Sequence, residues 1–276
     1  MQAVGPILIT GCSSGIGAAS ASRLARAGHL VYATARRPEQ LSALAAAGCQ
    51  PLALDVTDDD SMRAAVDAIV AEHGRVGALV NNAGYGEYGA IEDVDLDRVR
   101  RQFETNVIGL ARMCQLVLPS MRAVGRGRIV NVGSMGGRLT FPFGGYYHAT
   151  KHAVEALSDA LRYEVAPFGI RVSLLEPGPI RTEFLATIGA TLADSTPDDS
   201  PYARSARAFD KAAHRIYRTP LLWASADAVA RVIERAVTSP RPQSRYVVSR
   251  RVRLALATRV LLPGKAWDAV LRTQVR

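Results

Sequence analysis

Residues 6–17 read Pro-Ile-Leu-Ile-Thr-Gly-Cys-Ser-Ser-Gly-Ile-Gly, and an Ala-rich stretch, residues 18–27, follows them. The apolar start predicts a short buried strand, and the Ala-rich stretch predicts a helix. Glycines between a strand and a helix let the backbone approach a pyrophosphate, and the helix N-terminus adds N–H groups and a positive dipole end. The segment therefore predicts a dinucleotide site. Its spacing, Gly-x-x-x-Gly-x-Gly, differs from the commonest Gly-x-Gly-x-x-Gly fingerprint, and the alternative is an ordinary strand-to-helix turn.

Strand-like and helix-like segments alternate along the rest of the chain. Further strands are expected at 30–34, 51–54, 78–80, 127–134, 170–175 and 245–248, and further helices at 59–73, 96–121, 147–166 and 226–238. This alternation predicts an α/β fold with one Rossmann-type doubly wound domain, residues 1–250, whose mostly parallel seven-stranded sheet is flanked by helices. Residues 251–276 are expected to be a basic helical extension in two pieces split at Pro263-Gly264.

The end of the second expected strand indicates which cofactor is bound. It reads Ala35-Arg36-Arg37, with no carboxylate. Sites that prefer NAD hold the ribose hydroxyls with an acidic residue at this position. Two guanidinium groups suit the extra 2′-phosphate of NADP instead, with Arg36 ahead of Arg37. We therefore expect NADP(H) to be preferred over NAD(H). The alternative is that both are solvated surface arginines.

Polar residues end three other expected strands. Asp55 follows the third, where it would accept a hydrogen bond from an adenine amino group or cap the next turn. Asn81 and then Asn82-Ala83-Gly84 end the fourth, at the edge where open α/β sheets bind ligands. The alternative for Asn81 is a structural brace between strands. Ser134 ends the fifth strand in the same way.

Residues 147–151, Tyr-His-Ala-Thr-Lys, put a tyrosine and a lysine on one face of an expected helix. A phenol titrates near pH ~10, and a neighbouring ammonium lowers that pKa because it favours the phenolate. Tyr147 and Lys151 therefore make sense as a tuned proton donor and acceptor, although an exposed helix pair is the alternative. Ser134 lies 13 residues before Tyr147, and the Gly- and aromatic-rich loop between them could bring the hydroxyl beside the phenol.

Two segments depart from the regular pattern. Asn106 lies inside the expected helix 96–121, where Asn is unfavourable, so a kink, a buried hydrogen bond or a bound water is required. Residues 183–223 interrupt the alternation and would overhang the ligand edge, as a substrate lid or as a mobile surface excursion. The lid's apolar residues are Phe184, Leu185, Ile188, Leu192, Phe209, Ile216, Tyr217, Leu221, Leu222 and Trp223. With Met135, Leu139, Phe141 and Phe143 they predict an apolar pocket for a hydrophobic small molecule.

Composition and charge limit the location and the partners. No stretch approaches the ~18 apolar residues of a membrane span, and no secretory signal pattern opens the chain, so a cytoplasmic protein is expected. The three cysteines are widely spaced and odd in number, which predicts no metal site and no disulfide framework. The net charge is +9, and residues 241–276 hold nine Lys and Arg against one Asp. No nucleic-acid motif accompanies this basic tail, and peripheral membrane association is an accessory expectation.

These motifs together resemble the short-chain dehydrogenase/reductases over about residues 5–250, and most nearly the branch of the 17β-hydroxysteroid and retinol dehydrogenases. The resemblance rests on seven features in order: Thr10-Gly11-x-x-x-Gly15-Ile16-Gly17, Asp55, Asn82-Ala83-Gly84, Asn106, Ser134, Tyr147-x-x-x-Lys151 and Pro177-Gly178. It implies a homodimer or homotetramer.

The resemblance also implies a catalytic tetrad of Asn106, Ser134, Tyr147 and Lys151. Tyr147 would be the general acid and base, and Ser134 would polarise the carbonyl. Lys151 would lower the Tyr147 pKa and bind the nicotinamide ribose, and the Asn106 backbone carbonyl would hold a relay water. The implied cofactor-binding residues are Gly11, Ser13, Ser14, Gly15, Ile16, Gly17, Arg36, Arg37, Asp55, Val56, Asn82, Ala83, Gly84, Asn106, Val132, Tyr147, Lys151, Pro177, Gly178, Ile180 and Thr182.

The first functional hypothesis is an NADP(H)-dependent oxidoreductase that interconverts a hydrophobic alcohol and its ketone or aldehyde. A ketoreductase of 3-oxoacyl or polyketide substrates linked to a carrier or coenzyme A is the alternative within enzymes, with the basic tail attracting the acidic carrier. A non-enzyme alternative is an NADP-sensing regulator whose basic tail binds membrane or nucleic acid. A sugar epimerase also uses a Tyr-Lys pair, but the glycine spacing and the short substrate region disfavour it.

Overall fold

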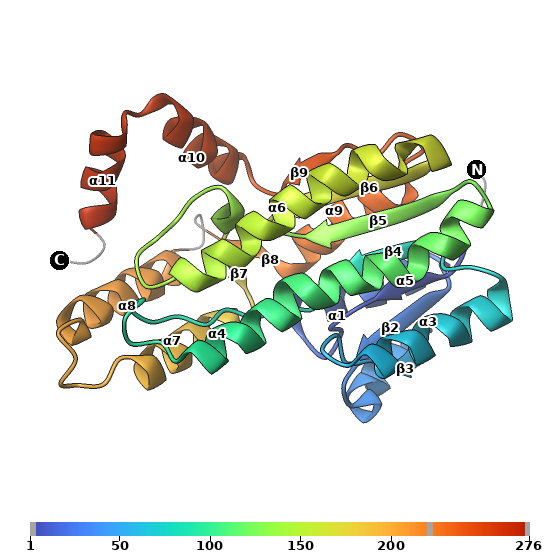
Figure 1. The fold of residues 1–276 in the computed structure, drawn as a ribbon, viewed down its shortest axis with the longest axis horizontal. Helices are drawn as coiled ribbons and strands as arrows, with labels where there is room; N and C mark the ends of the chain where they lie inside the picture. Colours follow the sequence, from blue (N-terminus) through green and yellow to red (C-terminus); the bar gives the residue numbers. More distant parts are fainter. Residues whose placement is uncertain (1–3, 220–222, 274–276) are drawn as a thin grey trace.

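A single parallel sheet forms the centre of the molecule in the computed structural model, which describes residues 4–219 and 223–273. Its strand order is β3-β2-β1-β4-β5-β6-β9, and all six neighbouring pairs are parallel (Figure 1). The strands are β1 (Ile7–Ile9), β2 (Val31–Ala35), β3 (Gln50–Ala53), β4 (Ala78–Asn81), β5 (Gly127–Val132), β6 (Ile170–Glu176) and β9 (Arg245–Val247). The predicted seven-stranded α/β fold is confirmed.

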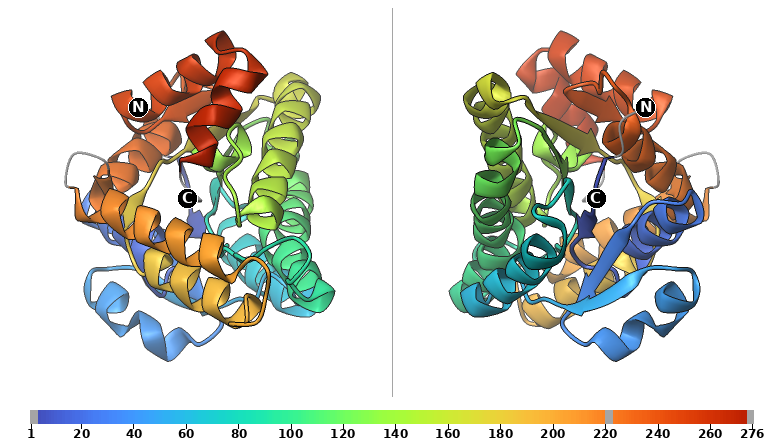
Figure 2. Two further views of the ribbon diagram at one scale, coloured as in Figure 1. Left: turned by 90° about the vertical axis from the view of Figure 1, so that its left-hand side faces the viewer. Right: turned by 90° about the vertical axis from the view of Figure 1, so that its right-hand side faces the viewer.

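Helices cover both faces of this sheet, on opposite sides in Figure 2. Ile7 and Ile9 of β1 pack on one face under α1 (Gly15–Arg26), α2 (Ser42–Ala46) and α9 (Ala226–Thr238). Leu8 packs on the other face under α3 (Asp59–His73), α5 (Gly109–Ala123) and α6 (Gly145–Val165). Successive side chains of a strand point to opposite faces. Because both faces are buried, the strands read as continuous apolar runs.

The expected helix over 96–121 is not continuous. α4 (Leu96–Phe103) runs through a π-helical turn, Glu104–Ile108, into α5. The turn carries Asn106, whose side-chain amide donates to the Tyr85 carbonyl oxygen at 2.8 Å. Of the three explanations for this Asn, the structure shows a buried hydrogen bond together with the widened turn, which the sequence did not predict.

The segment after β6 forms a helical cover. It contains α7 (Phe184–Ser195) and α8 (Ala203–Arg218). Polar contacts hold it to the loop after β4: the Tyr88 N–H donates to Thr191 Oγ1 at 3.2 Å, and Ser200 Oγ donates to Asp93 at 2.6 Å. The lid prediction agrees with this arrangement, whereas the expected residues Leu221 and Leu222 lie outside the described ranges.

Several short elements were not predicted. β7 (Ile180–Arg181) and β8 (Ala224–Ser225) form a two-stranded parallel sheet at the two ends of the lid. The 3-10 turns are η1 (Pro38–Leu41), η3 (Met135–Gly137) and η4 (Ala166–Phe168). Elements of two to four residues are too short to show a hydrophobic period, so pattern reading misses them.

The C-terminal segment forms α10 (Arg250–Leu261) and α11 (Gly264–Arg272), split where the sequence predicted. Val252 and Leu256 of α10 are buried against Leu139. Among the described residues, every helix is too short or too polar to traverse a bilayer. The proposed division into residues 1–250 and 251–276 stays a prediction.

Candidate active site

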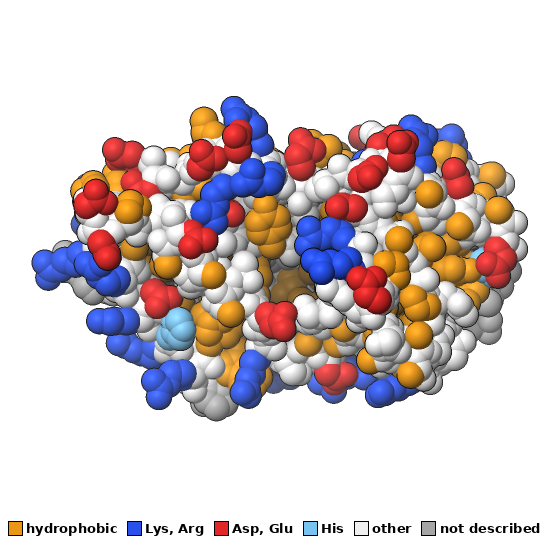
Figure 3. Space-filling model, turned by 90° about the horizontal axis from the view of Figure 1, so that it is seen from below, with side chains coloured by type: hydrophobic (Ala, Val, Ile, Leu, Met, Phe, Trp, Pro, Cys, Tyr) orange, Lys and Arg blue, Asp and Glu red, His pale blue; other side chains and the backbone are white. Residues whose placement is uncertain are grey.

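One large cleft lies at the carboxyl ends of the strands, beside the point where the strand order reverses between β1 and β4. Open α/β sheets bind ligands at such a switch point. The cleft has a volume of about 960 Å³. It extends from Arg36 and Arg37 past the glycine turn and Tyr147 to Phe209 and Tyr217 on α8. Seen from below, the molecule is hollowed near its centre, with hydrophobic side chains in the hollow (Figure 3).

The glycine turn has the shape that a pyrophosphate requires. Gly11 and Gly15 have φ angles of +69° and +59°, which side chains with a Cβ rarely adopt. A Cβ on Gly17 would lie 2.2 Å from the Gly11 carbonyl oxygen and 2.6 Å from Asn82 Nδ2. Asn82 Nδ2 holds the turn from behind by donating to the carbonyls of Thr10 and Gly11 at 3.0 and 2.9 Å. These residues therefore fit a bound dinucleotide.

Most residues of the expected cofactor set line the cleft. Those that do are Gly11, Ser13, Ser14, Gly15, Ile16, Arg36, Arg37, Asp55, Val56, Asn82, Ala83, Gly84, Val132, Tyr147, Lys151, Pro177, Gly178, Ile180 and Thr182. Gly17 and Asn106 are not in the lining. Gly17 instead gives the helix its close approach to the turn, and Asn106 lies behind the wall of the cleft.

The contacts of two strand-end residues bear on the alternatives left open for them. Asp55 Oδ1 accepts from the N–H and the hydroxyl of Thr57 at 2.9 and 2.8 Å, so it caps the turn while also lining the cleft. Asn81 donates to Asn131 Oδ1 at 3.0 Å between neighbouring strands and does not line the cleft. Asn81 is a structural brace.

Ser134 and Tyr147 meet at the middle of the cleft. Burial raises the pKa of the Tyr147 phenol to about 12, and a hydrogen bond with Ser134 partly opposes this shift. Ser134 Oγ accepts from the Gly136 N–H at 3.0 Å, which fixes the start of the η3 turn. The segment 135–146 between them thus brings the hydroxyl to the phenol, as the spacing of 13 positions suggested.

Lys151 is buried one helical turn after Tyr147. Its Nζ donates to the Val132 carbonyl oxygen at 2.9 Å and lies 5.9 Å from the centre of the Tyr147 ring. Burial lowers the pKa of Lys151 to about 8. Burial of the phenol raises the Tyr147 pKa in this structure, and the expected lowering of that pKa by Lys151 stays a prediction.

Asn106 acts on the site through its side chain. Its Oδ1 accepts from the Tyr85 N–H at 3.0 Å, and its Nδ2 donates to the Tyr85 carbonyl and to Thr150 Oγ1. Thr150 immediately precedes Lys151 on α6, so Asn106 joins the loop after β4 to the helix that carries the Tyr-Lys pair. The expected role of its backbone carbonyl stays a prediction.

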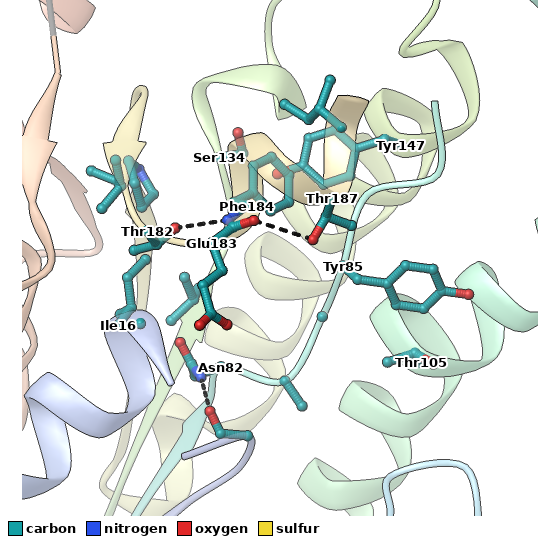
Figure 4. A pocket seen from close by; sticks show the side chains of 18 of the residues that line it. Ile16, Asn82, Tyr85, Thr105, Ser134, Tyr147, Thr182, Glu183, Phe184 and Thr187 are labelled. Carbon is teal, nitrogen blue, oxygen red and sulfur yellow. Dashed lines mark hydrogen bonds between the residues drawn. The ribbon is translucent and has the colours of Figure 1, made fainter. Parts of the chain in front are cut away.

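The far end of the cleft is apolar and aromatic. Phe184, Ile188, Phe209 and Ile216 of the lid helices line it. The Phe184 ring centre lies 5.4 Å from that of Tyr147, and the close view shows Ser134, Tyr147 and Phe184 around the same part of the cleft (Figure 4).

Two of the four apolar residues expected before Tyr147 line the cleft. These are Met135 and Phe141. Leu139 packs beneath α10, and Phe143 packs against Phe209 at 5.6 Å between ring centres without reaching the lining. The prediction is therefore wrong for Leu139 and Phe143, because the loop turns their side chains away from the cavity.

Sequence reasoning missed two buried residues of the lining. The Tyr88 ring stacks on Tyr147, with ring centres 5.7 Å apart, and burial raises its pKa well above the ordinary value. His148 Nδ1 contacts the Gly136 carbonyl at 3.1 Å, and burial lowers the pKa of this imidazole to about 4, so it is neutral at pH 7. An aromatic residue in the loop after Asn82-Ala83-Gly84 was the available signal for Tyr88.

The fold and the cleft define an α/β oxidoreductase of the kind that binds nicotinamide cofactors, and the chain belongs to the short-chain dehydrogenase family, whose model matches residues 6–193. It is 43% identical over 199 residues to a 3-ketodihydrosphingosine reductase of Bacteroides thetaiotaomicron, which covers 72% of each chain. It is 36% identical over 259 residues to human 17-beta-hydroxysteroid dehydrogenase type 1, covering 89% of this chain and 77% of that protein.

Solved structures agree with this assignment. A short-chain dehydrogenase from Streptomyces avermitilis superposes with a TM-score of 0.76 at 31% identity, covering 98% of this chain and 95% of that one. The resemblance to this family is therefore confirmed, and a relative from the hydroxysteroid dehydrogenase branch is among the similar proteins.

Proposed function

We propose that this protein is an NADP(H)-dependent oxidoreductase that interconverts hydrophobic ketones or aldehydes and their alcohols, with Tyr147 as the general acid and base. One observation carries the proposal: a single cleft holds two arginines and a glycine turn at one end, Ser134 and Tyr147 in the middle, and the lid aromatics at the other. A substrate reaching Tyr147 from the lid side meets mainly Phe184, Ile188 and Phe209, which favours an apolar molecule.

The chain's own residues supply the proton and the polarisation. When bound, the nicotinamide cofactor supplies the hydride. Tyr147, whose pKa is raised to about 12, stays protonated at pH 7 and can donate to a carbonyl oxygen. Ser134 Oγ accepts from the Gly136 N–H, and its hydrogen, which lies towards the Tyr147 oxygen in the free protein, would turn to the substrate oxygen. Gly11, Gly15 and Asn82 would shape the pyrophosphate site, and Lys151 would bind the nicotinamide ribose.

The name of one relative supports the reducing direction. The bacterial protein that shares 43% identity over 199 residues is a reductase of a keto compound. The buried, protonated phenol suits the same direction, because a carbonyl oxygen that receives hydride requires a proton donor. We therefore propose that reduction of a ketone is the favoured reaction.

Turnover of a carbonyl panel tests the proposal. The panel contains long-chain alkyl ketones, a steroid ketone, an aryl ketone and a 3-oxoacyl thioester, each assayed with NADPH. We expect apolar ketones to be reduced and Tyr147→Phe to lower kcat by about 10³-fold or more, because the proton donor is lost. NADPH binding by the variant should stay within about threefold of wild type, since a phenyl ring preserves the packing.

Three outcomes would count against the proposal. A tenfold or greater preference for the thioester would favour the carrier-linked ketoreductase instead. NADPH binding without turnover of any carbonyl would favour the regulator. Equal activity of wild type and Tyr147→Phe would remove the assignment of the proton donor.

Assembly into a homodimer or homotetramer and a cytoplasmic location stay predictions. Light scattering of the purified chain tests the assembly.

A further inference from the structure

α10 has apolar side chains on two opposite sides. Val252 and Leu256 face inward and are buried. Leu254 and Leu261 are 68% and 81% exposed, and with Ala257 they stand at i, i+3 and i+7 on the outer side of the helix. Val260, beside this stripe, is 74% exposed. Helix packing inside the molecule accounts for the inner side only.

The same segment is strongly basic. Arg250, Arg253 and Arg259 on α10 and Lys265 and Arg272 on α11 are all exposed. Within the described part of this segment, residues 250–273, the single acidic residue is Asp268. Arg250 and Arg253 flank the Leu254 end of the outer stripe. Because Val252 and Leu256 are buried, the opposite side of α10, which carries Leu254 and Leu261, faces outward.

We propose that α10 and α11 dock on the surface of an anionic lipid bilayer. Leu254, Val260 and Leu261 would enter the boundary between headgroups and acyl chains, and the flanking guanidinium groups would meet lipid phosphates. A nucleic acid fits this surface less well, because exposed Leu and Val gain nothing from phosphates. Trp267, an aromatic that could stack on a base, is instead half-buried, and Arg259 lies over its ring at 5.7 Å.

The docking surface is connected to the cleft. The inner side of α10 packs beside Met135 and Phe141, which both line the cleft. α10 and α11 also lie at the same end of the sheet as the lid helices α7 and α8 (Figure 1). A docked molecule would thus hold the apolar end of its cleft near the bilayer, where hydrophobic molecules dissolve. The docking itself does not depend on the proposed chemistry.

Vesicle sedimentation of the full chain tests the proposal. We expect the protein to pellet with vesicles of phosphatidylcholine containing phosphatidylglycerol, to remain largely in solution with phosphatidylcholine alone, and to be released by added salt. The paired substitution Arg250→Gln and Arg253→Gln should lower the partition coefficient by about tenfold or more, as expected for two basic residues near an anionic surface. Leu254→Gln with Leu261→Gln should lower it by about tenfold as well.

Matched substitutions elsewhere give the controls. Arg207→Gln with Arg231→Gln removes two arginines whose side chains are 60% and 58% exposed on other helices. Ile91→Gln removes an apolar side chain that is 63% exposed and distant in sequence from α10 and α11. Both should leave vesicle binding within about twofold of wild type, and all variants should retain the wild-type melting temperature because every altered side chain is exposed.

Each contrary result would overturn the proposal. One is equal pelleting with neutral and anionic vesicles, or none with either. Another is that the variant Leu254→Gln with Leu261→Gln still binds anionic vesicles while the protein binds duplex DNA more tightly than vesicles. The surface would then be a nucleic-acid site. A third is that the wild-type protein is a dimer, the paired leucine variant is a monomer, and neither protein binds vesicles. The stripe would then be a contact between copies of this chain.

Discussion

Burial has the same consequence for Tyr147 and Lys151 on α6: it favours their neutral forms. The Tyr147 pKa rises to about 12 and the Lys151 pKa falls to about 8, in each case chiefly through desolvation. At pH 7 the phenol therefore keeps its proton with a wide margin, whereas the ammonium keeps its charge with a narrow one. The free protein is prepared for proton donation, and the charge of Lys151 is its pH-sensitive component.

The Lys151 shift predicts how cofactor affinity depends on pH. Lys151 loses its proton as pH rises through about 8. We therefore expect the NADPH dissociation constant to increase by about tenfold between pH 7 and pH 9.5, the loss of one charge-assisted hydrogen bond. Titration of the protein with NADPH at constant ionic strength, followed by fluorescence, measures this dissociation constant. Lys151→Met should bind weakly with little pH dependence, and Lys265→Met, on the exposed α11, should follow wild type. A constant affinity in wild type would contradict the assignment.

Arg36 should determine the choice between the two nicotinamide cofactors. Arg36→Asp replaces a guanidinium that suits a 2′-phosphate by a carboxylate that suits ribose hydroxyls. We expect kcat/KM for NADPH to fall by about 100-fold and that for NADH to hold or rise, measured with one ketone. Arg37→Asp, which alters the neighbouring exposed arginine of the same cleft, should have the smaller effect. An unchanged preference in Arg36→Asp would leave the phosphate without its proposed partner.

At the scale of the elements, the close contact between α1 and the turn after β1 depends on Gly17. A Cβ at this position would meet the Gly11 carbonyl oxygen at 2.2 Å, a backbone atom that cannot yield without moving the turn. Gly17→Ala should therefore reduce the free energy of unfolding by about 1–3 kcal/mol, which lowers the melting temperature by several degrees. It should also weaken NADPH binding at least tenfold. Gly264→Ala, where an added Cβ meets nothing within 4 Å, is the control and should change neither. Wild-type affinity in Gly17→Ala would contradict this account.

The sequence predicted the long, periodic elements and not the irregular ones. The strands and helices were expected within a few residues because both faces of the sheet bury apolar side chains, as Leu8 between Ile7 and Ile9 shows. The π-helical turn at Asn106 was not predicted, because an unfavourable residue indicates a departure without specifying which one. The pairing of β7 with β8 depends on contacts between residues 44 positions apart, which no local pattern contains.

In the site, too, the residues with a regular local context were predicted and those in irregular segments were not. Ser134, Tyr147 and Lys151 were predicted to come together because each has a strand end or a helix face as its context. Tyr88 was missed, since its place over Tyr147 is set by the fold of an irregular loop. The rise of the Tyr147 pKa through burial was not predicted, because a sequence shows a neighbouring lysine but not the extent of burial.

At the scale of the whole molecule, one arginine joins the outer edge of the sheet to α6, the helix that carries Tyr147 and Lys151. Arg245 on β9 donates to Glu155 on α6, to Glu176 at the end of β6 at 2.7 Å, and to Asp159 at 2.6 Å. Glu176 also accepts from Arg138, which follows the η3 turn. Glu155 lies one turn after Lys151, and Glu176 precedes Pro177-Gly178 of the cleft wall. This network therefore links three segments that form the site.

Arg245→Met should lower the free energy of unfolding, because it leaves buried carboxylates of that network without the Arg245 charge. Glu155 would lose its guanidinium partner, and the fully buried Glu176 would keep only Arg138, at 3.3 Å. Removing one member of a buried pair costs roughly 3–5 kcal/mol. Because the Arg245 side chain is 30% exposed, we expect the low end, about 3 kcal/mol at pH 7.5 by urea unfolding. Arg231→Met, which breaks an exposed pair with Asp227, should cost about 0.5 kcal/mol or less.

The sign of the pH dependence separates this electrostatic effect from lost packing. Burial already raises the Glu155 pKa, and loss of Arg245 would raise it further. The folded variant then holds a proton at pH values where the unfolded chain has released it, so its stability falls as pH rises through that window. The deficit of Arg245→Met relative to wild type should therefore shrink towards pH 5. A deficit of equal size at pH 5 and 7.5 would show that Arg245 contributes by packing and that the buried carboxylates do not depend on its charge.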